Sequence, residues 1–216
     1  MTILALEFSS SQRNVAVARN GCVLAQTSEA GGRETHAFGM IEKVLAAAKI
    51  GREEIGCLVV GLGPGSYTGI RVALSIAQGW QLAAGVKLLG IGTVECLVAQ
   101  ARAEKMFGGV SVVIDAQRGE FYLATFEVAA GGVKETVPLK IVPAMEVESR
   151  AAAGEILAGP EATRWFPAGK VLFPQAAMLA TLAARRTDFV AGEKLEPVYL
   201  RETNFVKAPP VRTMVS

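Results

Sequence analysis

One order of strands and turns occurs twice in this chain of 216 residues. In the first copy, alternating apolar residues predict a strand over Thr2–Phe8, followed by a polar turn and two strands joined at Asn20-Gly21. In the second copy, a strand over Val110–Asp115 is followed by a turn and two strands joined at Gly131-Gly132. The copies align on their turns about 110 residues apart, which indicates an internal duplication. A duplicated chain is expected to fold as two related lobes.

Helices and strands alternate between the two copies. Apolar residues at helical spacing predict a helix over Glu34–Lys49, and an apolar run predicts a buried strand over Ile55–Leu62. A helix ending near Ala84, a strand over Lys87–Ile91 and a helix from Thr93, expected as its cap, to about Ala103 follow. Three antiparallel strands followed by helix, strand, helix, strand and helix are typical of one α/β architecture.

That architecture is the duplicated ribonuclease-H-like or actin-like ATPase (ASKHA) fold, with a mixed five-stranded sheet and a reduced second lobe. We therefore expect an N-terminal actin-like lobe over residues 1–103 and a smaller C-terminal lobe over residues 104–216. A single doubly wound sheet is the alternative. A short strand is expected over Glu155–Ala158, and the surrounding stretch Gly154–Gly169, rich in Pro and Gly, is expected to be mostly loop.

Composition excludes several classes of function. The net charge is +2 and no run of Lys or Arg stands out, so we expect no strong independent binding to nucleic acid. His36 is the only histidine, so one chain cannot supply two histidine ligands to a metal. Cys22, Cys57 and Cys96 are an odd, widely spaced set within apolar segments, typical of buried free thiols in a reducing compartment. The sequence shows no signal peptide and no membrane span, so we expect a cytoplasmic protein without membrane contact.

Both copies of the first strand end in an acid, Glu7 and Asp115. A phosphate-handling protein of this architecture needs an aspartate there to hold Mg²⁺, beside a glycine-rich turn whose N–H groups approach the phosphates. Here the turn Phe8–Gln12 contains no glycine, and Glu7 is longer than aspartate. Nucleotide hydrolysis is therefore expected to be absent or weak. A partly solvated acid at a strand end is the alternative interpretation of Glu7.

The segment Gly63–Gly69 is the sharpest local feature of the chain. It is neither a Walker loop nor a clean dinucleotide fingerprint, because it lacks the Gly-Lys pair of the first and the third glycine of the second. A strand, a glycine-rich turn and a helix N-terminus still form a ready anion site. The candidate contacts to an anion or nucleotide are Gly63, Gly65, Ser66 and Thr68. A tight strand-to-helix turn without a ligand explains the same residues.

The helix that follows this segment is apolar on most sides, with a stripe of small residues and a narrow polar stripe. One side can cover a sheet, and another needs a second layer, either the helix over Glu34–Lys49 or another chain. Small residues allow helices to approach closely. We therefore expect an interchain interface built from these two helices. Its candidate residues are Met40, Ile41, Val44, Arg71, Ala73, Leu74, Ala77 and Trp80.

Four segments, in their order and spacing, span nearly the whole chain: Ile3–Ser10, Gly61–Ala77, Asp115–Tyr122 and Pro197–Arg201. The second contains Gly-Pro-Gly-Ser-Tyr-Thr-Gly-Ile-Arg and is the most specific of them. Together they resemble the TsaB (YeaZ) family, whose members are bacterial partners of the TsaD enzyme in tRNA threonylcarbamoyladenosine synthesis. The family usually has Asp where this chain has Glu7. This difference further weakens the expectation that the chain binds a nucleotide directly in the cleft between its two lobes.

The resemblance implies an actin-like fold without a metal site or cofactor of its own. It implies a non-catalytic subunit that activates TsaD, the enzyme that transfers threonylcarbamoyl to adenosine at position 37 of tRNA, in an assembly joined by the ATPase TsaE. The expected partners are therefore a TsaD-like enzyme and a TsaE-like ATPase. Homodimers through the helical face also occur in the family. The chain is expected to reach tRNA only through the complex. Whether a nucleotide binds at the partner interface is left open.

Two other functions compete with this expectation. A stand-alone ATPase or kinase of the same fold would need metal-holding acids and glycine turns, which are altered here at Glu7 and Phe8–Gln12. A peptidase, a description attached to relatives of this group, would need a metal site or a triad. His36 alone cannot build either in an evident way.

Overall fold

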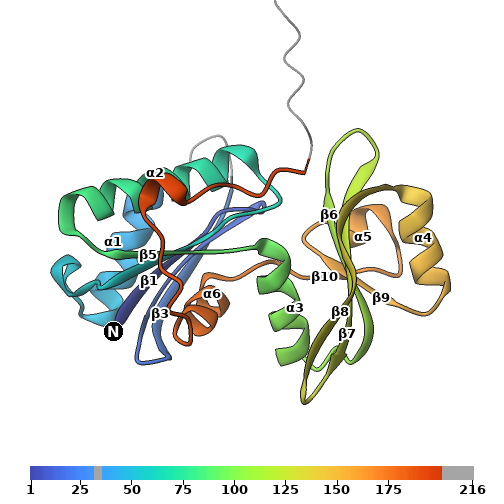
Figure 1. Cartoon of the computed structure of the whole chain (residues 1–216), viewed down its shortest axis with the longest axis horizontal. Helices are drawn as coiled ribbons and strands as arrows, with labels where there is room; N and C mark the ends of the chain where they lie inside the picture. The colour runs from blue at the N-terminus through green and yellow to red at the C-terminus, as the bar shows by residue number, and fades with distance from the viewer. Residues whose placement is uncertain (32–35, 201–216) are drawn as a thin grey trace, which may run out of the picture.

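A computed structural model of the chain describes residues 1–31 and 36–200, which form two five-stranded sheets beside each other (Figure 1). The strand order is β3-β2-β1-β4-β5 in the first sheet and β8-β7-β6-β9-β10 in the second. The strands are β1 Thr2–Glu7, β2 Gln12–Arg19, β3 Cys22–Ala30, β4 Cys57–Gly61, β5 Lys87–Ile91, β6 Gly108–Asp115, β7 Glu120–Ala129, β8 Gly132–Pro143, β9 Ile156–Gly159 and β10 Lys170–Val171.

The two sheets also share their strand directions. β1 is antiparallel to β2 and parallel to β4, and β6 is antiparallel to β7 and parallel to β9 in the same way. The second copy is the reduced one, because β10 contains only Lys170 and Val171. The duplicated, mixed five-stranded fold is therefore confirmed, and the single doubly wound sheet is excluded.

Helices cover both faces of each sheet. α1 and α2 pack on one face of the first sheet and α6 packs on the other, while α3 lies between the sheets and α4 and α5 cover the far face of the second (Figure 1). The helices are α1 Ala37–Ala48, η1 Arg52–Glu54, α2 Tyr67–Ala84, α3 Thr93–Ala103, α4 Ala144–Ala152, α5 Ala162–Trp165, α6 Ala176–Ala183 and η2 Gly192–Lys194. The predicted start of the first helix, Glu34, lies outside the described residues.

Burial on both faces explains the apolar run of β1. Leu4 and Leu6 point into the core beneath α1 and α2, whereas Ile3 and Ala5 point into the core beneath α6. Side chains alternate along a strand, so a strand covered on both sides reads as continuously hydrophobic. Glu7 therefore lies at the end of a strand with no solvent-facing side, and it is fully buried.

The chain returns to the first sheet after it has completed the second. α6 packs against β1, β2 and β4, and η2 packs against α2. Gly192 is fixed there because its N–H donates to Gln81 Oε1 over 2.7 Å and its carbonyl accepts from Gln78 Nε2 over 2.9 Å. That residues 1–103 and 104–216 are two separate domains stays a prediction. In space, the first sheet takes its last covering helix from the C-terminal part of the chain.

Some local predictions are wrong. The strand expected over Glu155–Ala158 is confirmed as β9, but the rest of the stretch Gly154–Gly169, expected to be loop, also contains the helix α5. Thr93 was expected to cap α3, but Gly92 is the N-cap and Thr93 is the first helical residue. Its buried hydroxyl donates to Ser9 Oγ over 2.8 Å. Thr93 is therefore used to tie α3 to the first turn of the chain.

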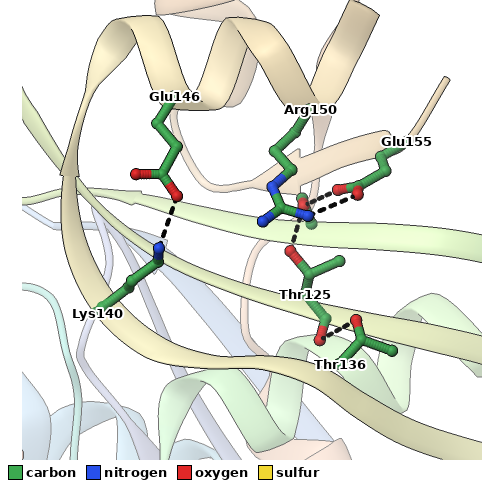
Figure 2. A network of polar contacts seen from close by, with 7 residues as sticks. Thr125, Thr136, Lys140, Glu146, Arg150 and Glu155 are labelled. Atoms are coloured by element: carbon green, nitrogen blue, oxygen red, sulfur yellow. Dashed lines mark hydrogen bonds and ion pairs between the residues drawn. The ribbon is translucent and has the colours of Figure 1, made fainter. Parts of the chain in front are cut away.

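A polar network links the strands of the second sheet to α4 and the loop before β9 (Figure 2). The buried Ser111 hydroxyl donates to Glu155 Oε2 over 2.5 Å and lies 2.8 Å from the Thr125 hydroxyl. Arg150 forms an ion pair with Glu155 over 3.1 Å. These contacts provide the partners that buried polar groups need, so the two hydroxyls are accommodated among apolar strands.

Candidate functional site

The first turn of the chain and the glycine-rich segment lie against each other. Ser66 N–H donates to the Ser9 carbonyl over 2.6 Å. Gly65 has φ +149°, and a Cβ added there would lie 2.1 Å from the same carbonyl oxygen. Thr93 N–H donates to the Gly63 carbonyl over 2.7 Å. Gly65 therefore allows one part of the backbone to approach another closely. A glycine-rich turn can equally allow the backbone to approach a ligand.

Arg13, at the start of β2, fastens this contact. Its Nη1 donates to the carbonyls of Phe8 and Ser10, and its Nη2 donates to Ser66 Oγ over 3.0 Å. A Cβ at Gly69 would lie 2.4 Å from Nη1, so glycine is needed there to make room for the guanidinium. Burial lowers the pKa of Arg13, and the nearby Glu7 carboxylate opposes this shift. The guanidinium thus supplies an internal positive charge between the two loops.

Glu7 fills the end of β1. Its Oε1 accepts from Ser9 N–H over 2.7 Å, whereas Oε2 has no hydrogen-bond partner among the described residues. A Cβ at Gly61 would lie 2.0 Å from Oε2, so the carboxyl group packs on the bare backbone of β4. Burial raises the pKa of Glu7, and the hydrogen bonds from Ser9 and the charge of Arg13 partly oppose the rise. The alternative of a partly solvated strand-end acid is wrong, because the side chain is fully buried.

The predicted anion contacts occupy different environments. Ser66 N–H is used by Ser9, and its hydroxyl oxygen accepts from Arg13 and from Gly69 N–H, the latter over 3.4 Å as the cap of α2. Gly63 is buried and Gly65 half-buried, whereas Thr68 is exposed on the first turn of α2. An anion contact at these residues stays a prediction. The geometry accounts for Gly63, Gly65 and Ser66 as a tight turn that holds α2 on the first sheet.

The equivalent turn of the second lobe is more open. Gln117 N–H donates to Asp115 Oδ1 over 2.7 Å, so the acid caps its own turn. Gln117 and Arg118 both have positive φ, at +66° and +61°, and Arg118 is exposed. Gly119 also has positive φ, at +74°, and Ala116 N–H donates to the Glu120 carbonyl over 2.9 Å, so residues 117–119 form a three-residue turn between the antiparallel strands β6 and β7. Arg118 is placed as a solvent-exposed turn residue.

The predicted interchain surface divides into buried and accessible residues. Most of the predicted residues are buried in the core beneath α1 and α2, so their contact with another chain stays a prediction; these are Met40, Ile41, Val44, Ala73, Leu74 and Ala77, of which Ile41 also lines the outer surface. Arg71 is exposed and Trp80 is half-buried on the outer side of α2. The apolar stripe thus fits the chain's own sheet, and the helical pattern alone could not distinguish a sheet from a partner chain.

A groove of about 840 Å³ lies on the outer side of these helices, and we call it the α1–α2 groove. Phe38 of α1 stands beside it with 64% of its surface exposed. Val72, Ile76 and Trp80 of α2 line it together with Gly79. Exposed apolar side chains gathered around a groove are typical of a protein–protein contact surface. Phe38 and Gly79 were missed because a single exposed residue on a helix carries no sequence signal.

An aromatic cluster includes Tyr67 and Arg71 from the lining of the α1–α2 groove. The Arg71 guanidinium lies 4.0 Å from the centre of the Tyr67 ring, and its Nε donates to Tyr199 Oη over 3.3 Å. The two tyrosine rings are 5.8 Å apart. The segment before Tyr199 is held by a hydrogen bond from Val198 N–H to the Leu62 carbonyl over 2.9 Å. Two of the segments that carry the family resemblance therefore meet here, while Arg201 lies outside the described residues.

The described residues contain no candidate metal centre. Within ranges 1–31 and 36–200, no group of three or more His, Cys, Asp or Glu residues could hold a metal ion.

Cys57 and Cys96 are buried as predicted, whereas Cys22 is exposed. Burial raises the pKa of Cys57 to about 11 and raises that of Cys96 as well. Of the helices that the structure describes, none is long and apolar enough to cross a membrane.

The duplicated sheets and the turns at Glu7 and Asp115 define this chain as a protein of the actin-like ATPase (ASKHA) fold. The family model for TsaD, tRNA N6-adenosine threonylcarbamoyltransferase, matches residues 34–180. Within that class, the chain belongs to the TsaB (YeaZ) family: this family model covers more than half of the chain, and TsaB proteins and YeaZ structures align with most of it.

Two curated relatives are tRNA threonylcarbamoyladenosine biosynthesis proteins TsaB. The Escherichia coli protein is 28% identical over 93% of this chain and 95% of its own length. The Bacillus subtilis protein is 27% identical over 64% of this chain and 60% of its own length. YeaZ from Pseudomonas aeruginosa has a TM-score of 0.76 at 26% identity, covering 92% of this chain and 99% of that chain. A second Pseudomonas aeruginosa structure, of a protein similar to peptidase YeaZ, has a TM-score of 0.77 at 26% identity, covering 93% and 99%.

Proposed function

We propose that this chain is the non-catalytic subunit that activates a TsaD-like enzyme during tRNA N6-threonylcarbamoyladenosine formation at position 37. One observation carries the proposal. The turn after β1, where a nucleotide-cleaving relative would hold metal and phosphate, is bonded instead to the glycine-rich segment through Ser9, Arg13 and Ser66. Because these hydrogen-bond donors are used within the chain, we infer that the chain acts by presenting a surface to a partner enzyme. Its relatives are named as biosynthesis proteins of the same tRNA modification.

The α1–α2 groove is the proposed docking surface for the TsaD-like enzyme. Its apolar lining, the exposed Phe38 ring and the cluster of Tyr67, Arg71 and Tyr199 are the kinds of groups that dominate interface energies. Because the same surface can pair with itself, a homodimer would compete with the enzyme for it. A TsaE-like ATPase joins the assembly in this proposal, and any nucleotide binds at the junction with the partner. Transfer RNA is contacted through the complex, in the cytoplasm.

Reconstitution tests this proposal. The TsaD-like enzyme and the TsaE-like ATPase of the same cell are combined with threonylcarbamoyl donor and unmodified tRNA, with or without this chain, and modified nucleoside is measured by mass spectrometry. We expect product to form only when the chain is present. An equal rate without the chain would overturn the activating role. Strong Mg²⁺-dependent ATP hydrolysis by the chain alone would instead support a stand-alone ATPase or kinase.

A further inference from the structure

A second groove, of about 1040 Å³, lies where the two lobes meet. It is lined by α3, by α6 and by the hairpin of β7 and β8, which lie together on the side of the molecule away from α1 and α2 (Figure 1). We call it the interlobe groove. α6 packs on the first sheet, whereas α3 and the hairpin belong to the second core. Anything bound in the interlobe groove would therefore touch both lobes and leave the α1–α2 groove free.

The floor of the interlobe groove is apolar. It is formed by Val94 and Val98 of α3 and by Met178 and Leu182 of α6. Phe107 also lines it, with 45% of its surface exposed. Two adjacent helices with apolar side chains between them form the kind of surface on which an amphipathic helix docks through residues spaced three or four apart. Such a floor does not suit nucleic acid, whose main contacts are charged phosphates.

The rim of the interlobe groove is basic. Arg102, Lys105 and Arg185 lie along it. Neither Lys105 nor Arg185 forms an ion pair in the part of the chain that the structure describes, and Arg102 donates to a neutral main-chain carbonyl over 2.9 Å. Two acids also line the groove: Glu95 is paired with Arg186 over 3.1 Å, while Glu135 forms no ion pair in the described part of the chain, so the basic side chains of the lining outnumber the acidic ones. The rim therefore offers positive charge that a ligand with negative charge at its edges would complement.

We propose that the interlobe groove binds a partner protein through an amphipathic helix whose apolar stripe is flanked by acidic residues. The stripe packs between α3 and α6, and the acidic flank lies against Lys105 and Arg185. The bound helix bridges the two lobes and fixes their relative orientation. This second docking surface does not depend on the identity of the protein that occupies the α1–α2 groove, so a failure of either proposal leaves the other standing.

Two synthetic helical peptides test the charge complementarity. They share one apolar stripe, and one carries Glu and the other Lys at the flanking positions. Binding to the full chain is measured by fluorescence anisotropy. We expect the acidic peptide to bind about fivefold more tightly or better, as two exposed charge pairs of ordinary strength provide. The double variant Lys105→Glu with Arg185→Glu should lose this preference. The control Lys43→Glu with Lys170→Glu changes the net charge equally at exposed positions outside the groove and should keep it.

Chemical shifts of the Met178 methyl group locate the bound peptide, because this side chain lies in the floor. The proposal expects them to move with the acidic peptide in wild type and in the control. Equal binding of both peptides, or binding that leaves Met178 unshifted, would overturn it. A single-stranded RNA oligonucleotide that binds more tightly than the acidic peptide would also overturn it, in favour of an RNA surface. Unfolding midpoints of all variants confirm that they are folded.

Discussion

Substitution of Gly61 by alanine tests whether Glu7 truly fills the end of β1. A Cβ at Gly61 would lie 2.0 Å from Glu7 Oε2 and 2.6 Å from its Cδ, so the carboxyl group must move. The carboxyl group is enclosed by the core and held by Ser9 N–H, which leaves it little room. Glu7→Asp shortens the side chain and withdraws the obstacle. Gly61→Ala should therefore be harmful in wild type and tolerated in the Glu7→Asp background.

The size of the effect follows from two opposing contributions. Overpacking a core costs about 1–3 kcal/mol, while alanine in a strand gains about 0.5–1 kcal/mol over glycine. The net loss for Gly61→Ala is then about 1.5 kcal/mol, or roughly 3–6 °C in Tm for a chain of this length. In the Glu7→Asp background only the gain remains. The coupling free energy between the two substitutions is the overpacking cost itself, about 2 kcal/mol.

Urea unfolding of wild type, both single variants and the double variant measures this coupling free energy. Gly39→Ala is the control, because a Cβ there meets nothing within 4 Å and helical alanine should stabilise α1. If Gly61→Ala costs the same free energy of unfolding in both backgrounds, Glu7 does not pack on β4. The end of β1 would then be open, and the argument that the chain fills its own phosphate site would fail.

Three further predictions concern buried groups near or beneath this turn. Arg13→Met removes the guanidinium that joins the two loops and should lower the free energy of unfolding by about 3 kcal/mol, measured in urea; a loss near zero would show that the contact is dispensable. The pKa of Glu7 is raised from 4.5 by burial, so the folded chain binds this proton more tightly than the unfolded chain. The free energy of unfolding should then fall as pH rises from 4.5 through the raised pKa, and Glu7→Gln should remove this slope in urea titrations at several pH values; an unchanged slope would contradict the assignment. Cys22 is exposed, whereas burial raises the pKa of Cys57 to about 11 and raises that of Cys96. A thiol reagent should therefore modify Cys22 alone in the folded chain and all three cysteines in urea, as counted by mass spectrometry. Rapid modification of a second thiol without urea would contradict the burial of Cys57 and Cys96.

The fold could be predicted because its signals are local and repeated. Alternation over Thr2–Phe8, the Asn20-Gly21 turn and their second copies determine which strands pair and in which direction. The return of α6 to the first sheet could not be predicted in this way. That packing depends on contacts between residues more than a hundred positions apart, which no periodicity reports.

The site was predictable in its location but not in its contacts. The glycine-rich segment and Glu7 were recognised, yet both accept more than one explanation until the neighbouring groups are known. Arg13 was missed because an arginine in a strand ordinarily reads as a solvent-facing residue, whereas here it is buried against two carbonyls. Met40 and Ala73 were assigned to a partner chain because an apolar helical stripe looks the same whichever surface it covers.

Association of this chain with the TsaD-like enzyme, measured by isothermal titration calorimetry, tests the central claim most directly. Gly79→Glu places a charge in the α1–α2 groove, and Gly39→Glu places the same charge on α1 outside the groove lining; a Cβ at either glycine meets nothing within 4 Å. We expect wild type and Gly39→Glu to bind the enzyme with equal affinity, while Gly79→Glu loses measurable binding. Undiminished binding by a folded Gly79→Glu variant would contradict the central claim.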